Sequence, residues 1–259
     1  MFAAVVDADR GGRFQIAPQL DDAVYRQLYL PDTNVLLTGF LSDSGVAEVS
    51  DFMPVEDAGV AHNLVRRAKT VRGEIHFDMR CEPRFDYARA SHTVERRGDT
   101  ELVFVGRSGE RELALRLRSS VPMRVENGVA IAQFTLRADE SPSFVLEVVR
   151  AAEPSPCGSR DYPIAAFKQT VNFWRRWVGR STYKNRWREM VNRSALILKL
   201  LTSRAHGSIV AAPTFGLPEH MGASVTGTIV TAGSGTHLSL STDSCDWATR
   251  KRRPRSCAG

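Results

Sequence analysis

The sequence predicts a mainly β protein with helices: an antiparallel β-sandwich comes first, linker helices follow, and the last residues have a different character. Period-two alternation of apolar residues fills roughly the first 150 positions, a Pro/Ser/Gly-rich segment follows at 153–159, and the apolar period then changes to three and four. The expected divisions are a sandwich at 1–152, a linker at 153–165, helices at 166–222, and an unstructured tail at 223–259.

Apolar and polar residues alternate in the predicted strands, for example over 74–80 and 112–118. Alternation of this kind is typical of a strand with one buried face, because successive side chains point to opposite faces. Asn127-Gly128 separates two further stretches and is a strong signal for a two-residue hairpin turn. Many short strands at this spacing favour a sandwich. The apolar members of the two examples are Ile75, Phe77, Met79, Leu113, Leu115 and Leu117.

Two amphipathic helices are predicted after the linker, over 166–178 and 183–202, because apolar residues recur there at three- and four-residue spacing. Ser181 or Thr182 is expected to cap the second helix. The predicted apolar positions are Phe167, Val171, Trp174 and Val178 in the first helix, and Trp187, Met190, Val191, Ser194, Leu198 and Leu201 in the second.

The residues after Gly222 differ from everything before them. In 223–244, thirteen of the 22 residues are Ser, Thr or Gly, and no helical period is present. A basic run follows at 250–255. One interpretation is a nucleic-acid-binding arm, whose affinity would fall steeply with salt. We favour translation of GC-rich DNA out of frame, which yields Arg, Pro, Ser, Thr and Gly.

Composition argues against membrane and secreted proteins. Hydrophobic residues make up 42% of the chain, no apolar run reaches the roughly eighteen residues of a membrane span, and the start lacks the basic region of a secretory signal. We therefore expect a cytoplasmic protein without a membrane partner. The net charge of +6 falls to +3 without the tail, which holds five basic and two acidic residues. That value gives no reason to expect a nucleic-acid partner.

Cysteines and histidines show no metal-binding spacing. The four cysteines are far apart, without a CxxC pair, and the six histidines include no HExxH motif. We expect free thiols, no metal site and no cofactor. The cysteines are Cys81, Cys157, Cys245 and Cys257.

Several segments, taken in order, carry a resemblance to a known family. They are NVLLT at 34–38, GVAEVSDFMPV at 45–55, PRFDY at 83–87, Trp187 with NRSALILKLL at 192–201, and GSIVAAPTFGLPE at 207–219. Over residues 2–222 the chain resembles the bacterial branch of glycoside hydrolase family fifteen, which holds glucoamylases and trehalases. The resemblance implies a β-sandwich, a helical linker and an (α/α) barrel, which this chain would not complete. Its start resembles a point a few dozen residues into the family, so we expect the first strands of the sandwich to be missing.

The resemblance also implies an activity: inverting hydrolysis of α-glucosidic bonds in trehalose or maltooligosaccharides. Such enzymes use a glutamic acid and a second carboxylate about 6.5–9.5 Å apart. Both family glutamates lie beyond this chain, so no catalytic residue is assigned. The resemblance implies substrate binding by Thr214, Pro218 and Glu219, although Phe215-Gly216 replaces the usual Thr-Ser. Four upstream carboxylates, expected to be solvated rather than catalytic, are Glu56, Asp57, Glu82 and Asp86.

The genetic code links the tail to the same family. After Leu-Pro-Glu the family continues with a sugar-binding segment of the form GERNWDYRYCWIRDA. Reading the third base of each codon with the first two of the next allows residues 222–237 to encode that whole segment. Further on, Cys245-Asp246 permits only Arg or a stop, Asp246-Trp247 only Leu, and Trp247-Ala248 only Gly, where the family has Arg-Leu-Gly. These matches indicate a one-base loss near Gly222.

Two classes of function remain open at this point. The first is a truncated, inactive fragment of a glucoamylase- or trehalase-type hydrolase. The second is a non-catalytic β-sandwich module that binds a protein or glycan partner, which an exposed aromatic platform would favour. In either case the helix pair would lack the barrel helices that normally cover it, so we expect poor solubility or self-association through its apolar residues.

Overall fold

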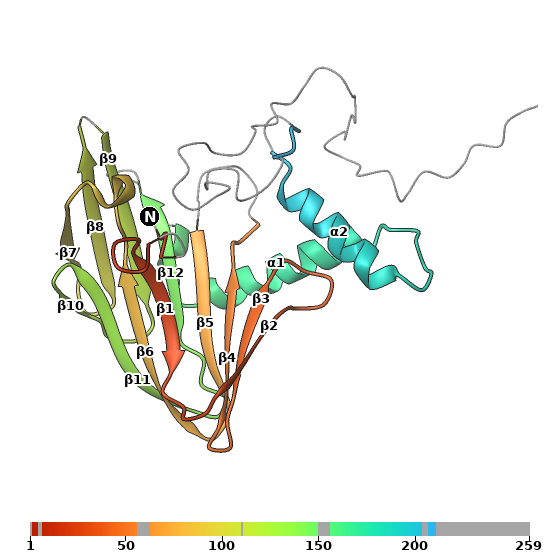
Figure 1. The fold of residues 1–259 in the computed structure, drawn as a ribbon, viewed down its shortest axis with the longest axis horizontal. Coiled ribbons are helices and arrows are strands. Elements are labelled where there is room, and N and C mark those ends of the chain that lie inside the picture. Colours follow the sequence, from red (N-terminus) through yellow and green to blue (C-terminus); the bar gives the residue numbers. More distant parts are fainter. Residues whose placement is uncertain are drawn as a thin grey trace, which may run out of the picture. The chain divides into compact units, whose positions relative to one another are not determined.

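A computed structural model describes residues 2–4, 7–55, 63–109, 111–149, 156–203 and 207–210 (Figure 1). The chain divides into two compact units. Unit 1 comprises Met1–Leu30 and Val35–Val171, and unit 2 comprises Pro31–Asn34 and Asn172–Gly259. The tail predicted at 223–259 lies outside the described residues.

Unit 1 is built from two antiparallel sheets, as predicted. One has four strands in the order β1-β6-β11-β10, and the other has eight in the order β2-β3-β4-β5-β12-β9-β8-β7 (Figure 1). The short 3-10 turns η1 (Asp86–Ala88) and η2 (Pro156–Gly158) interrupt the connections. The strands are β1 Arg13–Pro18, β2 Val24–Tyr29, β3 Leu36–Leu41, β4 Val46–Phe52, β5 Asn63–Arg72, β6 Glu74–Glu82, β7 His92–Arg96, β8 Glu101–Ser108, β9 Arg111–Ser119, β10 Arg124–Glu126, β11 Val129–Arg137 and β12 Ser143–Val149.

The main core lies between the two sheets. On the smaller sheet the predicted alternation of β6 is confirmed, because Ile75, Phe77 and Met79 are buried. Phe77 stands opposite Phe134 of β11, and the two rings stack with their centroids 5.5 Å apart. Cys81 belongs to the same buried cluster, and its burial raises the pKa of the thiol.

The Asn127-Gly128 dipeptide forms the predicted hairpin turn, between β10 and β11. The backbone φ angles are 51° at Asn127 and 77° at Gly128. Type I′ turns, which match the twist of the two strands of a hairpin, require positive φ at both central residues. Asn and Gly tolerate positive φ best.

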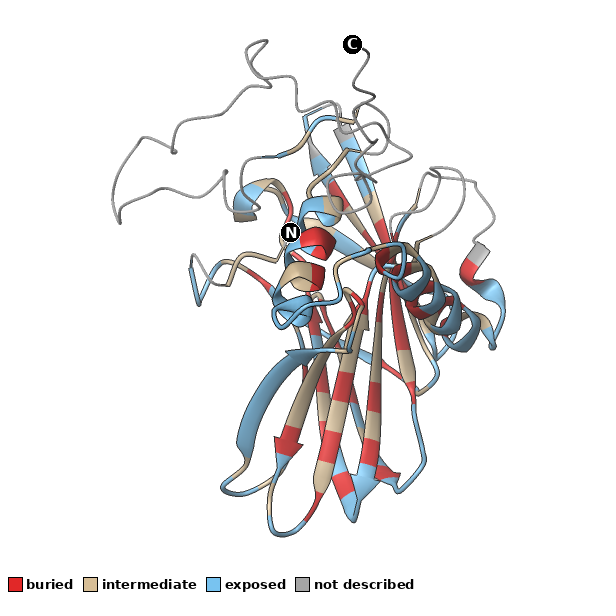
Figure 2. Ribbon diagram, turned by 90° about the vertical axis from the view of Figure 1, so that its right-hand side faces the viewer, coloured by how far each residue is buried: buried red, intermediate tan, exposed pale blue. Residues whose placement is uncertain are grey.

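The eight-stranded sheet is also covered on its outer face. Helix α1 (Tyr162–Val178) begins four residues before the predicted start, with Pro163 in its first turn, where a missing N–H costs nothing. Its first half packs on Val65 and Val145 through Ala166 and Val171. The sheet therefore has a second, smaller core, and Figure 2 shows buried residues as bands across its middle strands.

An aromatic and a basic residue extend this second core. The ring of Phe167 meets Phe52 of β4 edge to face at 5.5 Å, and the guanidinium of Arg67 lies 5.1 Å from the Phe167 centroid. Burial lowers the pKa of Arg67 from its ordinary value. The predicted apolar side of the first helix is confirmed, since Val171, Trp174 and Val178 are buried.

Unit 2 contains helix α2 (Arg188–Leu200), whose predicted details are partly wrong. The helix begins at 188 rather than 183, and Trp187 occupies the N-cap position without a side-chain hydrogen bond, so neither Ser181 nor Thr182 caps it. Its buried residues are Asn192, Ala195 and Leu196, whereas four predicted apolar positions have other environments. Trp187, Met190 and Leu198 are exposed, as is Ser194.

The packing of the main core allows a prediction of how much stability is lost when a central phenylalanine is replaced by alanine. Phe144 is fully buried on β12, and replacing it by alanine leaves a cavity among rigid strands. We expect Phe144→Ala to lower the free energy of unfolding by about 3–5 kcal/mol in urea denaturation. Val71→Ala, at a position 45% exposed on β5, is the control and should stay within about 0.5 kcal/mol. Similar losses in both variants would contradict this core.

Candidate functional site

The substrate-binding residues expected from the resemblance, Thr214, Pro218 and Glu219, lie outside the described residues, as do Glu56 and Asp57. Of the remaining upstream carboxylates, Glu82 was expected to be solvated, and that expectation is wrong. It is 8% exposed at the end of β6.

Arginines hold both remaining carboxylates. Glu82 accepts a hydrogen bond from Nε of Arg80 at 3.1 Å and another from Arg84. Asp86 lies in η1 and accepts a hydrogen bond from Arg89 at 2.9 Å. Each carboxylate therefore neutralises neighbouring guanidiniums, which is a structural role.

A buried network of charges lies on the outer face of the eight-stranded sheet. Arg116 of β9 pairs with Glu147 of β12, with 3.2 Å between Nη1 and Oε1. Glu101 of β8 lies 3.5 Å from Arg116 Nε and 2.8 Å from Arg118 Nε. Two arginines and two glutamates thus alternate across three adjacent strands. Arg116 is 7% exposed and Glu147 is 4% exposed, so this network is sheltered from water.

The sequence contained one signal for this network. Glu147 stands inside the apolar run FVLEVV, which is typical of a strand buried on both faces. A charged residue in such a strand needs an oppositely charged partner. Arg116 and Arg118 alternate with leucines and look like the solvated face of an ordinary strand. These arginines are sheltered because residues far along the chain, from Cys157 to Val171, cover that face of the sheet.

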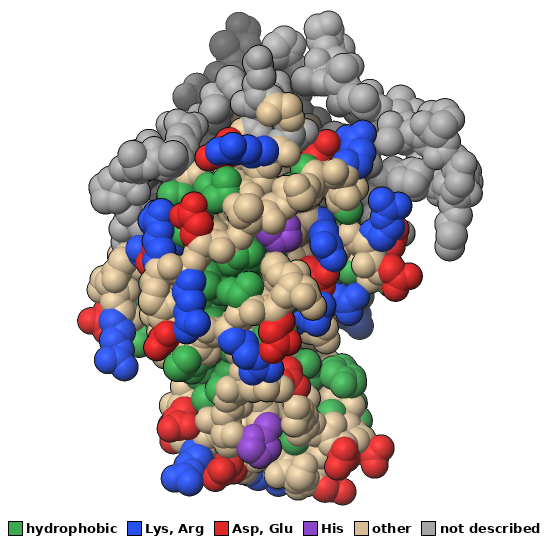
Figure 3. Space-filling view, turned by 90° about the vertical axis from the view of Figure 1, so that its left-hand side faces the viewer, with side chains coloured by type: hydrophobic (Ala, Val, Ile, Leu, Met, Phe, Trp, Pro, Cys, Tyr) green, Lys and Arg blue, Asp and Glu red, His purple; other side chains and the backbone are tan. Residues whose placement is uncertain are grey.

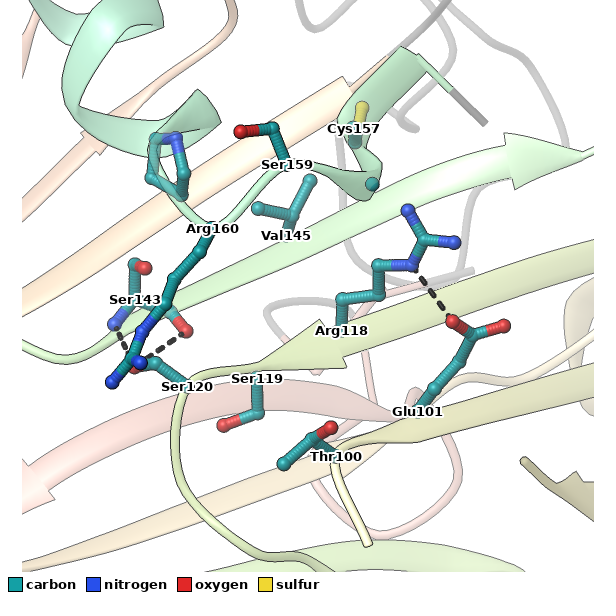
Figure 4. Close-up of a pocket in the computed structure, with 12 residues that line it drawn as sticks. Thr100, Glu101, Arg118, Ser119, Ser120, Ser143, Val145, Cys157, Ser159 and Arg160 are labelled. Atoms are coloured by element: carbon teal, nitrogen blue, oxygen red, sulfur yellow. Dashed lines mark hydrogen bonds and ion pairs between the residues drawn. The ribbon is translucent and has the colours of Figure 1, made fainter. Parts of the chain in front are cut away.

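A polar pocket of about 470 Å³ opens beside the network (Figure 4). In Figure 4 the Arg118 side chain extends toward Glu101, and Arg160 extends toward Ser120 and Ser143. The backbone N–H of Ser143 donates to Ser120 Oγ at 2.9 Å. The lining residues are Thr100, Glu101, Arg118, Ser119, Ser120, Ser143, Val145, Cys157, Gly158, Ser159, Arg160 and Pro163.

The lining of this pocket supplies hydrogen-bonding groups rather than a pair of carboxylates. Among the described residues that line it, Glu101 is the one carboxylate, and arginines neutralise it. Inverting hydrolysis needs two carboxylates about 6.5–9.5 Å apart, one of which must supply a proton. Hydroxyl groups and guanidiniums instead offer hydrogen bonds to a polar ligand.

Other kinds of site were sought along the described ranges. They hold no cluster of three or more His, Cys, Asp or Glu side chains placed to bind a metal. No helix in the described part of the chain is both long and apolar enough to span a bilayer. Figure 3 shows basic and acidic side chains interspersed over one face, without the single-sign patch that nucleic acid would require.

Two of the sequence segments that carry the resemblance meet in unit 2. Asn34 donates through Nδ2 to the carbonyl oxygen of Leu196 at 3.2 Å and accepts from Arg193 Nη1 at 2.9 Å. Asn192 Nδ2 donates to Asp32 at 2.9 Å. The segments at 34–38 and 192–201 are therefore joined by hydrogen bonds, and Asn192 points toward the loop. This contact explains why the buried side of α2 is not its most apolar side.

Comparison with known proteins agrees with this organisation. Residues 1–149 match the family described as Trehalase-like, N-terminal. The chain belongs to this family. The trehalase of Thermoplasma acidophilum is 26% identical over 226 residues, which are 86% of this chain and 38% of that protein.

Further relatives give the same pattern. The trehalase of Mycolicibacterium smegmatis is 29% identical over 243 residues, covering 85% of this chain and 35% of the relative. Trehalase 1 of Sulfolobus acidocaldarius is 28% identical over 222 residues, covering 86% and 35%. The chain therefore spans little more than a third of the length of these trehalases.

The buried charge network of this trehalase-like domain yields a stability prediction. Replacing Glu147 by glutamine leaves Arg116 buried without its nearest counter-charge, which should cost about 3–5 kcal/mol in the free energy of unfolding. The control is Glu112→Gln, because the Arg107–Glu112 pair is 77% and 42% exposed. That exposed pair should contribute about 1 kcal/mol or less. Equal effects in chemical denaturation would refute the distinction between the two pairs.

Proposed function

We propose that residues 1–222 are the N-terminal portion of a cytoplasmic trehalase- or glucoamylase-type hydrolase of glycoside hydrolase family fifteen. The intact relative would hydrolyse α-glucosidic bonds in trehalose or maltooligosaccharides by inversion, without a metal or organic cofactor. The chain itself has no hydrolytic activity. The match of residues 1–149 to the trehalase-like N-terminal family is the observation that carries this proposal.

The relatives support the loss of activity. They are trehalases, and more than 60% of their length has no counterpart in this chain. The three carboxylates considered as replacements, Glu82, Asp86 and Glu101, are each paired with arginines. A carboxylate paired in this way is poorly placed to donate a proton to a leaving group.

The reading-frame shift near Gly222 belongs to the same proposal. Residues 1–222 make up about 86% of the chain, and the trehalase relatives align with 85–86% of it. The fraction of the chain that aligns with the relatives thus equals the fraction that precedes the change in composition after Gly222. The codons of residues 222–237 permit the sugar-binding segment GERNWDYRYCWIRDA in the alternative frame.

A sugar assay tests the proposed lack of activity. The purified 259-residue chain should release no glucose from trehalose or maltose above the buffer blank, because the carboxylate pair is absent. A chain carrying Glu82→Gln serves as the control, and the two should be indistinguishable. Glucose release by the native chain above the blank would overturn the proposal, and its loss in Glu82→Gln would assign the activity to that carboxylate.

Self-association through the helical unit is a second element of the proposal. Helix α2 and its N-cap expose Trp187 (55%), Met190 (65%) and Ile197 (45%), which share one side at three- and seven-residue spacing. Exposed apolar groups of this kind recruit a partner surface. In the longer relatives, additional chain is available to cover them.

Introducing a charge at the centre of this apolar side should reduce association. We expect Met190→Glu to lower the mean mass measured by light scattering at high protein concentration, because burying a glutamate is costly. Asn185→Glu, an exposed polar position just before α2, is the matched control and should leave the mass unchanged. An identical mass distribution for Met190→Glu and the native chain would rule out this surface.

A second candidate function is a non-catalytic module that binds a protein or glycan partner. The exposed aromatic residues of β2 favour it: Tyr25 is 68% exposed and Tyr29 is 46% exposed. Tyr25 also lines a groove of about 460 Å³ between the two sheets, together with Gln27, Thr38 and Phe40.

A further inference from the structure

The groove of about 460 Å³ between the two sheets has the size of a small-molecule site, since such pockets measure about 300–1,000 Å³. Of the smaller sheet only β1 lines it, whereas β2, β3, β4 and β5 of the larger sheet form its floor. A four-stranded sheet is too narrow to cover an eight-stranded one completely. The groove lies where the face of the larger sheet continues beyond β1.

The floor of the groove is polar although it belongs to the face that forms the main core. Gln27 of β2 stands opposite Thr38 of β3, and Thr38 stands opposite Val49, a core residue of β4. Asp51 lies two residues further along β4, on the same face, and stands opposite Arg66 of β5. Strand register therefore brings an amide, a hydroxyl, a carboxylate and a guanidinium together on one side of the sheet.

The ion pair in this floor is held in a fixed geometry. Arg66 donates through Nε and Nη2 to the two carboxylate oxygens of Asp51, at 2.8 and 3.0 Å. Its Nη1 donates to the carbonyl oxygen of Phe14, and its guanidinium lies 4.9 Å from the centroid of the Phe14 ring. An apolar pair of similar volume often stabilises a protein equally well, so stability alone does not explain this ion pair. A carboxylate can accept about four hydrogen bonds, and Arg66 uses two of them.

An aromatic ring stands beside the polar floor. Tyr25 is 68% exposed and meets Phe40 edge to face, with 5.4 Å between the ring centroids. This contact orients the Tyr25 ring and leaves most of it open. The negative face of an aromatic ring attracts the weakly positive C–H groups of a sugar ring. Next to it, Gln27 donates through Nε2 to Thr38 Oγ1 at 3.3 Å, which leaves a second N–H and the amide oxygen for a ligand.

The charges that line the groove favour a neutral ligand. They belong to Arg13, Asp51 and Arg66. Asp51 and Arg66 neutralise each other, and the Asp51 carboxylate would repel a phosphate or carboxylate group bound at the floor. Arg13 donates through Nη2 to the carbonyl oxygen of Ala8 at 2.8 Å. Hydroxyl groups both donate and accept, so they match a floor that holds donors and acceptors side by side.

We propose that this groove binds a neutral α-glucoside, with one glucose ring packed on Tyr25 and its hydroxyl groups hydrogen-bonded to Gln27, Thr38 and Asp51. The choice of glucose rests on the proposed function, in which the intact relative acts on trehalose or maltooligosaccharides. The site holds the sugar without cleaving it. Among the described residues that line the groove, Asp51 is the one carboxylate, and inversion needs two.

Failure of this site would leave the assignment as a hydrolase fragment unaffected. That assignment is decided by the glucose-release assay and by the gene sequence, whereas the groove is tested by binding alone.

Calorimetric titration of the full 259-residue chain with trehalose and with maltotriose tests the site. We expect saturable binding of at least one of the two sugars. Tyr25→Leu keeps an apolar side chain beside Phe40 and removes the aromatic face, so the affinity should fall at least about tenfold. Tyr87→Leu is the matched control, because Tyr87 is 90% exposed on η1 and does not line the groove. Its affinity should stay within about twofold of that of the native chain.

Gln27→Leu tests the hydrogen bonds separately and should weaken binding about tenfold. Tyr25 and Gln27 are both exposed, so the Tyr25→Leu and Gln27→Leu chains should unfold at the urea concentration of the native chain, which separates lost binding from lost folding. Absence of saturable binding to the native chain, tighter binding of glucose 6-phosphate than of both neutral sugars, equal losses in Tyr25→Leu and Tyr87→Leu, or native affinity in Gln27→Leu would each overturn the proposal.

Discussion

Burial of the eight-stranded sheet on both faces is the constraint on which the rest of the structure depends. Its inner face meets the four-stranded sheet, and its outer face meets the first half of α1. Strands β5, β12 and β9 therefore cannot follow the usual rule of one solvated face. Val65 and Val145 satisfy the constraint by being apolar on the outer face, and Arg116 and Glu147 satisfy it by pairing. The helical linker thus completes the fold of unit 1.

Much of this fold could be predicted from the sequence, because local patterns decide it. Alternation over 74–80 places three side chains in the core, and Asn127-Gly128 forms the expected turn. Tertiary contacts decided what was missed. Hydrogen bonds from Asn192 and Arg193 to the loop at 31–34 determine which side of α2 is buried. The number of apolar residues on each side of the helix does not. Glu82 is buried at the end of β6, where Arg80 and Arg84 compensate its charge, and the spacing of the residues alone does not show that. The expected substrate-binding residues lie outside the described part of the chain.

The functional conclusion depends on the family match and on the side chains that surround the described carboxylates. Family membership is shown by the match of residues 1–149 to the trehalase-like N-terminal family. Glu82, Asp86, Glu101 and Glu147 of the described sandwich have arginine partners, and the polar pocket at Arg118 and Arg160 is lined by hydrogen-bonding groups with Glu101 as its one carboxylate. They support the proposal that this domain accompanies the catalytic part of a trehalase-type hydrolase.

Resequencing the gene from the codon of Pro213 to well past Gly259 tests the central claim most directly. If the residues after Gly222 are out of frame, one base inserted near that codon opens a frame that encodes the sugar-binding segment, continues through Arg-Leu-Gly-Tyr and reaches two further glutamates. That continuous frame is the result we predict. A stop codon in that frame before the sugar-binding segment ends, or codons that spell an unrelated sequence there, would contradict the descent of this chain from a complete trehalase-type hydrolase.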